Sequence, residues 1–290
     1  MTTLVLHPGS PKTATSTLQH ILRSNKDLLA EHGIGLILPE DIRGTGYFAK
    51  YIPAYRSQNT QDLGQLTKEF FAPHFGKFDR VICSDETFCH DFMPSREKNR
   101  GGIDGADFAA DELGKTGFGK TEIVLTIRPQ VELLTSSYTH FVHRRRESRA
   151  FEDWLASEVD LNRLLWRPAV QAFRARFGNE QVAVISMAMA RETGMHTYLQ
   201  AVLRAMTGNG VDLVFSEEKV HNPSASARAV ELCRVMNSHI VHKKKSGAVN
   251  TCLVTQFPSE EFGKFAPDWR PSKVLADRLC DDHAAALQHE

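Results

Sequence analysis

Two stretches of this chain combine lysine with glycine and hydroxyl side chains, the residue types that proteins use to bind phosphate. The first is HPGSPKTATSTLQ at residues 7–19, where Lys12 precedes a group of hydroxyl residues. The second is GKTGFGKT at residues 114–121, which fits the Walker A pattern G-x-x-x-x-G-K-[ST] at every position. A phosphate loop works because it leaves a strand and enters a helix, whose N-terminal N–H groups face the anion. The elements on either side therefore decide which stretch is the better candidate.

The elements around residues 7–19 have the required order. An apolar run at residues 2–7 predicts a strand that ends at His7, and a helical pattern follows the loop. Ligands of open α/β sheets bind at the carboxyl ends of such strands. Capping of the helix would explain one hydroxyl but not the whole group with its lysine. The sequence predicts an anion-binding loop here, although Leu6 and Pro11 occupy the positions of the two Walker glycines.

The elements around GKTGFGKT have the opposite order. A helical pattern precedes it and the strand-like TEIVLTIR at residues 121–128 follows it. Lys120 and Thr121 would then lead into a strand, without a helix N-terminus beside them. The sequence predicts a glycine-rich turn from helix to strand. A P-loop kinase or NTPase that uses residues 114–121 remains the alternative enzyme.

The order of elements along the whole chain predicts the scaffold for these loops. Short apolar runs predict strands at residues 2–7, 33–39, 79–86, 121–128 and 181–187. Helical patterns separate them, which favours an α/β fold with a central parallel sheet of about five strands flanked by helices. We expect a helix over residues 16–33, a long loop over residues 40–62 and a helical C-terminal third. One domain over residues 1–290 is predicted.

Composition excludes several classes of protein. Lys and Arg together number 35, as do Asp and Glu, so no overall charge favours nucleic acid. The five cysteines are scattered without a C-x-x-C pair, which argues against a disulfide framework or a zinc site. No apolar run approaches the roughly 20 residues of a membrane span, and no signal peptide is evident. We expect a cytoplasmic protein without a membrane span.

The stretch PKTATSTLQ resembles the 5′-phosphosulfate loop of sulfotransferases that use 3′-phosphoadenosine 5′-phosphosulfate (PAPS), a loop that commonly reads P-K-[ST]-G-T-[ST]. That family also has an arginine at a strand end and a serine eight residues later, which bind the 3′-phosphate; Arg128 and Ser136 match this spacing. SDETF at residues 84–88 resembles a segment of bacterial carbohydrate-type members. Two departures are Ala14 in place of the family's glycine, and Pro129 directly after the arginine rather than one residue later.

The resemblance implies a three-layer, P-loop-like fold and in-line transfer of a sulfuryl group from PAPS to a hydroxyl of a carbohydrate or related metabolite. Lys12 would be catalytic, by stabilising charge on the leaving oxygen, and no metal ion is expected. The residues implied to hold the donor are Lys12, Thr13, Ala14, Thr15, Ser16, Thr17, Arg128 and Ser136.

Glu86 is the candidate general base, because it follows the third predicted strand at its carboxyl end. Asp85 and His20 are alternatives, and the imidazoles at positions 90 and 140 are weaker ones. A nucleotide-binding protein of this family without catalysis is the non-enzyme alternative. Two basic clusters, at residues 143–149 and 242–245, have no assigned role.

Overall fold

The computed structural model describes residues 2–57, 63–89, 105–160, 164–208, 210–215 and 225–288. The chain forms two compact units. The first comprises Met1–Pro129, Asp160–Ser216 and Asp281–Glu290, and the second comprises Gln130–Val159 and Glu217–Cys280. A single domain over residues 1–290 stays a prediction. In the described parts of the chain, none of the helices is both long and apolar enough to cross a membrane.

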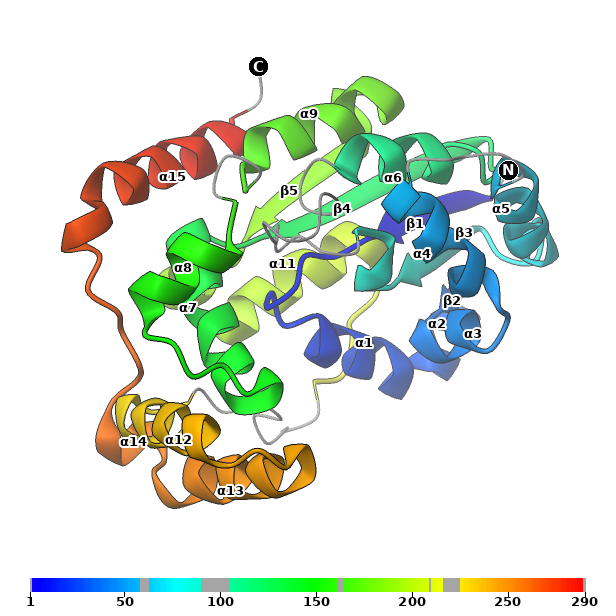
Figure 1. Ribbon diagram of the computed structural model, residues 1–290. Coiled ribbons are helices and arrows are strands. Elements are labelled where there is room, and N and C mark those ends of the chain that lie inside the picture. Colours follow the sequence, from blue (N-terminus) through cyan, green and yellow to red (C-terminus); the bar gives the residue numbers. More distant parts are fainter. Residues whose placement is uncertain are drawn as a thin grey trace. The chain divides into compact units, whose positions relative to one another are not determined.

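The first unit is built on an all-parallel sheet of five strands in the order β2-β3-β1-β4-β5 (Figure 1). The strands are β1 (Thr3–His7), β2 (Ile34–Ile37), β3 (Arg80–Ser84), β4 (Lys120–Ile127) and β5 (Val182–Ser186). Each lies where an apolar run of the sequence predicts it. The α/β class and the parallel sheet are therefore confirmed.

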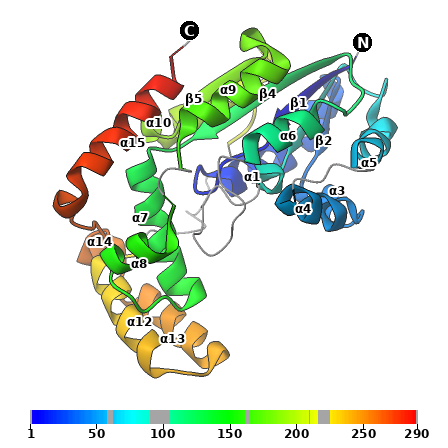
Figure 2. The ribbon, with the colours of Figure 1, turned by 45° about the horizontal axis from the view of Figure 1, so that its top comes forward.

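Helices cover both faces of the sheet, because its apolar side chains alternate between them. Val5, Ile82 and Val124 pack on one face against α1 (Thr15–Ser24) and α11 (Met195–Thr207). The helices α6 (Ala106–Leu113) and α9 (Trp166–Phe177) cover the other face, where α9 contacts β4 and β5 (Figure 2). The other helical segments of this unit are α2 (Lys26–Glu31), α3 (Pro39–Arg43), α4 (Tyr47–Ser57), α5 (Leu63–Phe71), η1 (Ala72–His74), η2 (Glu86–Cys89), η6 (Asn179–Gln181) and α10 (Ala188–Glu192).

Two sequence predictions about these helices are wrong. The loop expected over residues 40–62 is largely helical in its described part, where α3 and α4 form, because the buried rings of Tyr47, Tyr51 and Tyr55 recur every fourth residue on one side of α4. Residues 58–62 of that prediction lie outside the described residues. The helix expected over residues 16–33 is interrupted at Asn25. The Nδ2 atom of its buried side chain donates to the backbone carbonyls of Ile21 and Val214, and its Oδ1 atom accepts from the Val214 N–H.

The second unit is helical, as predicted for the last third of the chain. Its elements are α7 (Gln130–His140), the π-helical turn η4 (Phe141–Arg145), α8 (Phe151–Glu158), α12 (Ala227–His239), α13 (Lys243–Gln256), α14 (Ser259–Phe262) and η7 (Arg270–Ser272); α15 (Lys273–Ala286) ends in the first unit. Aromatic packing joins α7, α8 and the segment after α14, where Tyr138 lies against Phe151, Trp154 and Phe265 with ring centroids 5.3–5.4 Å apart.

The strand order fixes where a ligand can enter the first unit. From β1 the chain proceeds towards β2 at one edge, whereas from β4 it proceeds towards β5 at the other edge. Since β1 and β4 are neighbours, their outgoing loops diverge and leave a crevice at the carboxyl ends of these strands. The loops that follow β1 and β4 carry Lys12 and Arg128 respectively.

Candidate functional site

The loop that connects β1 to α1 has an unusual backbone. Gly9, Lys12 and Ala14 have φ angles of 57°, 66° and 61°, in the left-handed region that side chains with a Cβ rarely adopt. Left-handed residues in such turns direct backbone N–H groups into a concavity that binds anions. Ala14 stands where the resembled loop has a glycine, and its left-handed conformation is one that costs free energy for a residue with a Cβ.

Two hydrogen bonds hold this loop from one side. The guanidinium of Arg128 donates to the Lys12 carbonyl at 3.1 Å, and the Tyr198 hydroxyl donates to the Thr13 carbonyl at 3.0 Å. Burial raises the pKa of Tyr198, so its hydroxyl stays protonated and remains a donor. In a trans peptide the N–H points away from the C=O. The N–H groups of Thr13 and Ala14 therefore point away from Arg128 and Tyr198.

The first turn of α1 adds further donors. The helix begins at Thr15 with Ala14 as its N-cap, and no side chain in the described chain caps it or places an acid in its first turn. The Leu18 N–H bonds to the Ala14 carbonyl, so the preceding N–H groups lie before the first intrahelical bond. Together with the Lys12 side chain, these groups form a positive end that suits a phosphate or a sulfate.

A buried histidine lies beneath the loop. The fully buried imidazole of His7 is 2.9 Å from Ser84 Oγ on β3 and 3.1 Å from Thr126 Oγ1 on β4. Thr126 Oγ1 is in turn 2.9 Å from Thr13 Oγ1, which donates to the Ser10 carbonyl at 2.7 Å. Side chains from three neighbouring strands are thus linked to the loop by one chain of hydrogen bonds.

The number of protons on each group decides which atom donates in these hydrogen bonds. Because Thr13 donates its only hydroxyl proton to Ser10, it accepts from Thr126, and Thr126 accepts from His7 Nε2–H. Nδ1 is then the acceptor for Ser84. Burial lowers the pKa of His7 to about 3, so the imidazole is neutral near pH 7 and one nitrogen is free to accept.

Glu86, the candidate base, lies at the same edge of the sheet. It begins η2 directly after β3, and a Cβ built on Gly9 would lie 3.5 Å from its Cα and Cβ atoms. Gln19 donates to Glu86 Oε2 at 3.4 Å and to the Ser84 carbonyl at 3.2 Å, and Arg43 donates to Glu86 Oε1 at 3.4 Å. These two donors orient a carboxylate whose side chain is 41% exposed. The carboxylate is therefore both fixed in place and accessible.

Asp85 is the neighbouring acid that the sequence left open as an alternative base. Its carboxylate is fully buried, and Oδ1 accepts from the Thr87 N–H at 2.8 Å. Oδ2 lies 3.3 Å from Arg43 Nε. This burial favours Glu86 over Asp85 as the group that an acceptor molecule could reach.

The structure brings together most of the residues that the sequence selects. Residues 12–17, Glu86 and Arg128 all belong to the carboxyl edge of the first unit. Thr13 and Thr15 are buried, whereas Ser16 is exposed. Ser136 lies in α7 of the second unit, so its pairing with Arg128 stays a prediction.

The three histidine candidates differ in position. His20 lies on α1 beside Ser24 Oγ, at 3.2 Å. His140 is the last residue of α7 in the second unit. The histidine at position 90 lies outside the described residues.

Five further residues belong to this site although no sequence pattern selected them: His7, Gln19, Arg43, Thr126 and Tyr198. The histidine at the end of β1 and the threonine near the end of β4 were the sequence signals that could have predicted the hydrogen bonds beneath the loop. Nothing local marked Arg43, which fell in the expected loop, or Tyr198, which reaches the loop from a helix 185 positions away in sequence.

The perfect Walker motif is a turn from α6 to β4, as predicted. Gly114 ends α6, Gly117 has a φ of 89°, and Lys120 is already the first residue of β4. Lys115 pairs with Glu112, and Lys120 Nζ lies 2.6 Å from Glu122 Oε1. The motif therefore lacks a following helix, and its lysines are paired with glutamates.

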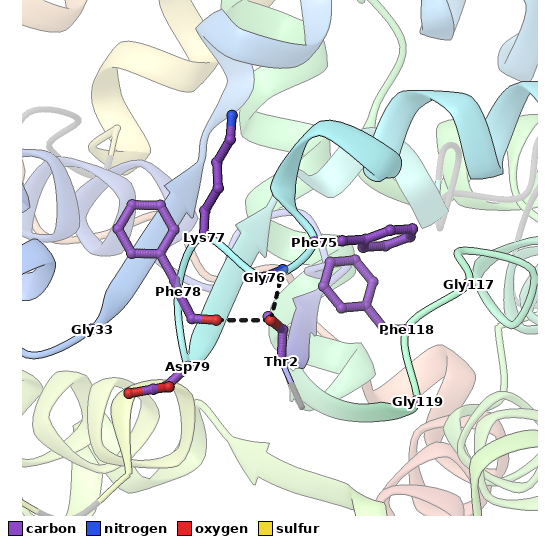
Figure 3. Close-up of a pocket in the computed structure, with 10 residues that line it drawn as sticks. All are labelled: Thr2, Gly33, Phe75, Gly76, Lys77, Phe78, Asp79, Gly117, Phe118 and Gly119. Carbon is purple, nitrogen blue, oxygen red and sulfur yellow. Dashed lines mark hydrogen bonds between the residues drawn. The ribbon is translucent and has the colours of Figure 1, made fainter.

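A hollow beside this turn lies at the amino-terminal ends of the strands, opposite the loop of β1 (Figure 3). Its lining is mostly backbone, glycine and the rings of Phe75, Phe78 and Phe118. Thr2 closes one side by donating to the Phe78 carbonyl at 2.8 Å and accepting from the Gly76 N–H at 3.1 Å. Its only cation is Lys77, so it offers little to a polyphosphate.

The acidic side chains at this edge do not form a metal-binding group. Across the residues with described positions, no group of three or more His, Cys, Asp or Glu side chains is placed to hold a metal ion. The carboxylates beside the loop, Asp85 and Glu86, are instead held by Arg43.

Substitution of Ala14 by glycine tests the strain in the loop. A Cβ on a left-handed residue costs about 1–2 kcal/mol, and the change to glycine relieves this cost. Glycine also raises the conformational entropy of the unfolded chain, which offsets part of the gain in stability. We expect the free energy of unfolding in urea to rise by up to about 1 kcal/mol. Ala30→Gly, on the exposed side of α2, is the control and should lower it by about 1 kcal/mol. Equal losses in both variants would contradict the strain.

Substitution of His7 by glutamine tests whether the buried imidazole is neutral in the native state. As pH falls below 6.5, unfolded His7 binds a proton, whereas native His7 does not until about pH 3. The wild-type protein thus loses stability through this window, at a limiting slope of about 1.4 kcal/mol per pH unit, and His7→Gln lacks that loss. The stability gap between the two, measured by urea unfolding from pH 7.5 to 4.5, should narrow on acidification. His239→Gln, at an exposed site, is the control. A gap that stays constant would show that His7 is protonated in the native state.

Both the sequence and the fold can be compared with known proteins. No family model matches the sequence, and none of the curated proteins matches it. Among solved structures, a sulfotransferase from Alicyclobacillus acidocaldarius matches 93% of this chain and 99% of its own, with 15% sequence identity and a TM-score of 0.46.

Proposed function

We propose that this protein is a PAPS-dependent sulfotransferase that transfers a sulfuryl group to a hydroxyl of a carbohydrate or related metabolite. The observation that carries the proposal is the loop of β1. Its carbonyls at Lys12 and Thr13 are held by Arg128 and Tyr198, which turns the N–H groups of Thr13 and Ala14 to the opposite side, and the Lys12 side chain and the N-terminus of α1 add positive charge to the loop.

The loop offers the groups that a 5′-phosphosulfate needs. Backbone N–H groups of Thr13 and Ala14, the first N–H groups of α1 and the hydroxyls of Ser16 and Thr17 are donors to phosphate and sulfate oxygens. The 3′-phosphate of the donor would bind Arg128, whose guanidinium has donors beyond the one used on the Lys12 carbonyl. Ser136, eight residues along the chain, is the proposed second donor.

The transfer itself needs positioning, charge stabilisation and a base. The acceptor hydroxyl attacks sulfur and loses its proton to Glu86. A new S–O bond forms to the acceptor as the S–O bond to the 5′-phosphate breaks, and the electron pair stays on the bridging oxygen. Lys12 stabilises the charge that develops there. The products are a sulfate ester and 3′-phosphoadenosine 5′-phosphate (PAP).

The arrangement disfavours the kinase alternative. GKTGFGKT leads into β4 instead of a helix, and its two lysines are engaged by Glu112 and Glu122. Freeing them for a nucleotide would leave Glu112, which is fully buried, without its cationic partner.

Nucleotide binding provides the first test of the proposed function. PAP should raise the melting temperature of the protein much more than ADP does, because only PAP carries the 3′-phosphate. Arg128→Ala should weaken PAP binding by about 1.5–3 kcal/mol, or roughly ten- to a hundredfold, and leave ADP binding nearly unchanged. Lys120→Ala is the matched control and should bind PAP normally. If Arg128→Ala weakens both ligands equally, the arginine holds the loop and does not read the 3′-phosphate. A thermal shift confined to ATP with magnesium would contradict the sulfotransferase.

Turnover provides the second test. Formation of PAP from PAPS should be followed with a panel of mono- and oligosaccharides as acceptors. Lys12→Ala and Glu86→Gln should each lower kcat by at least about a hundredfold, the scale of a lost charge-stabilising group or general base, while PAP binding survives in Glu86→Gln. Full activity in Glu86→Gln would exclude Glu86 as the base. PAP binding without turnover on any acceptor would favour a non-catalytic nucleotide-binding protein.

A further inference from the structure

The second unit carries two basic segments that the proposed reaction does not use. Residues 139–146 (THFVHRRR) contain three arginines and two histidines, and residues 232–259 contain an arginine, three lysines and two histidines. Neither segment contains an aspartate or a glutamate. In a chain with equal numbers of acidic and basic residues, this is a local separation of charge.

Buried hydrogen bonds hold the two segments side by side. Arg146 donates from its guanidinium to the Ile240 carbonyl at 2.5 Å. Asn250 on α13 donates to the Val142 and His143 carbonyls at 3.2 and 3.1 Å, and Asn237 on α12 donates to the Val142 carbonyl at 2.8 Å. The turn η4 is thereby joined to α12 and α13, which Figure 1 shows beside the end of α7.

The charged side chains at this junction are exposed. They are Arg144, Arg145, Lys243, Lys244 and Lys245, and we call them the basic surface. Within the described chain, none of the five has an ion pair or a side-chain hydrogen bond. Other arginines of the same unit are paired, as Arg149 is with Glu147 and Arg234 with Glu231. The basic surface therefore keeps its charge available.

The position of the lysines is unfavourable for the fold. Lys243, Lys244 and Lys245 form the first turn of α13, where no acid accompanies them. Cations at a helix N-terminus oppose the helix dipole and the free N–H groups. Residues that lower the stability of the folded protein without improving its packing are expected at functional sites. The three lysines are therefore candidates for a binding role.

We propose that the basic surface binds an anionic polysaccharide, whose carboxylate or sulfate groups are spaced along a flexible chain. Flexible, separate lysine charges suit such spaced anions, whereas rigid bidentate sites would select a single phosphate. Single-stranded nucleic acid is the competing polyanion, but its binding uses exposed aromatic rings for base stacking. The two segments contain two aromatic residues, and each packs against another ring: Phe141 against Trp154, and Phe257 against Phe262.

This inference rests on the proposed function, because a sugar polymer also supplies the hydroxyls that a sulfuryl acceptor must have. The basic surface would then hold an acidic glycan through the cations of the second unit alone. Glycan binding can be measured without turnover. An experiment can therefore contradict glycan binding by the basic surface without contradicting the proposed sulfotransferase, and the reverse.

The test measures equilibrium binding of fluorescently labelled polygalacturonate to the full chain at low and at physiological salt. The variant replaces Arg144, Arg145, Lys243, Lys244 and Lys245 with glutamine. The matched control replaces Lys26, Lys50, Lys68, Lys77 and Arg204, exposed cations of the first unit, with glutamine and so removes the same charge. Neutral dextran and the RNA homopolymer poly(U) are the comparison ligands.

We expect polygalacturonate to bind the wild type and the control, with an affinity that falls as salt screens the charges. The basic-surface variant should lose at least tenfold in affinity, and dextran should bind none of the three. The Lys243/Lys244/Lys245→Gln triple variant should also melt slightly higher than wild type at low salt, which shows that it is folded.

Three results would overturn the proposal: equal polygalacturonate binding by the basic-surface variant and the control, tighter binding of poly(U) than of polygalacturonate, or no binding of polygalacturonate by the wild type. PAP binding, measured on the same samples, reports on the proposed function independently. Loss of polygalacturonate binding with normal PAP binding supports the basic surface, and normal polygalacturonate binding without PAP binding contradicts only the sulfotransferase.

Discussion

A buried imidazole that is neutral near pH 7 organises the carboxyl edge of the sheet. His7 contacts Ser84 on β3 and Thr126 on β4, and through Thr126 it reaches Thr13 in the loop. A buried polar group without partners would cost free energy, so these hydroxyls must stay in register with the imidazole. Since Gln19 also bonds to the Ser84 carbonyl and to Glu86, the same constraint reaches the candidate base. The loop and the base are thereby held at one edge by a single connected network.

The two lysine-rich loops show how surroundings change the meaning of similar residues. In the loop of β1, a guanidinium and a phenol bind the backbone carbonyls, which leaves the N–H groups and the start of α1 for an anion. In the turn before β4, Glu112 and Glu122 bind the lysines instead, and a strand follows. The residue types are nearly the same in both, but only the first leads into the N-terminus of a helix.

Charge is distributed differently in the two compact units. At the carboxyl edge of the sheet in the first unit, Arg43 lies between the carboxylates of Asp85 and Glu86. At the junction of η4 and α13, buried asparagines supply the hydrogen bonds, so the exposed lysines and arginines keep their charge. Neutral amides are well suited to this role, because they satisfy backbone carbonyls without adding negative charge beside the cations. The proposed donor site and the proposed glycan surface thus use opposite electrostatic solutions.

The sequence by itself determined the five strands, their parallel arrangement and the helix-to-strand turn at the Walker-like motif, whereas phosphate binding by residues 12–17 stays a prediction. These follow from local periodicity and from the order of elements, which short segments encode. It could not show that Asn25 breaks a helix, that residues 39–57 are helical, or that His7, Thr126 and Tyr198 support the loop. Each depends on a partner distant in sequence: Val214 for Asn25, Phe88 for the tyrosines of α4, and Thr13 for Tyr198. Only the tertiary structure decides which buried polar groups meet, because their hydrogen bonds form between elements and leave no periodic trace within any one of them.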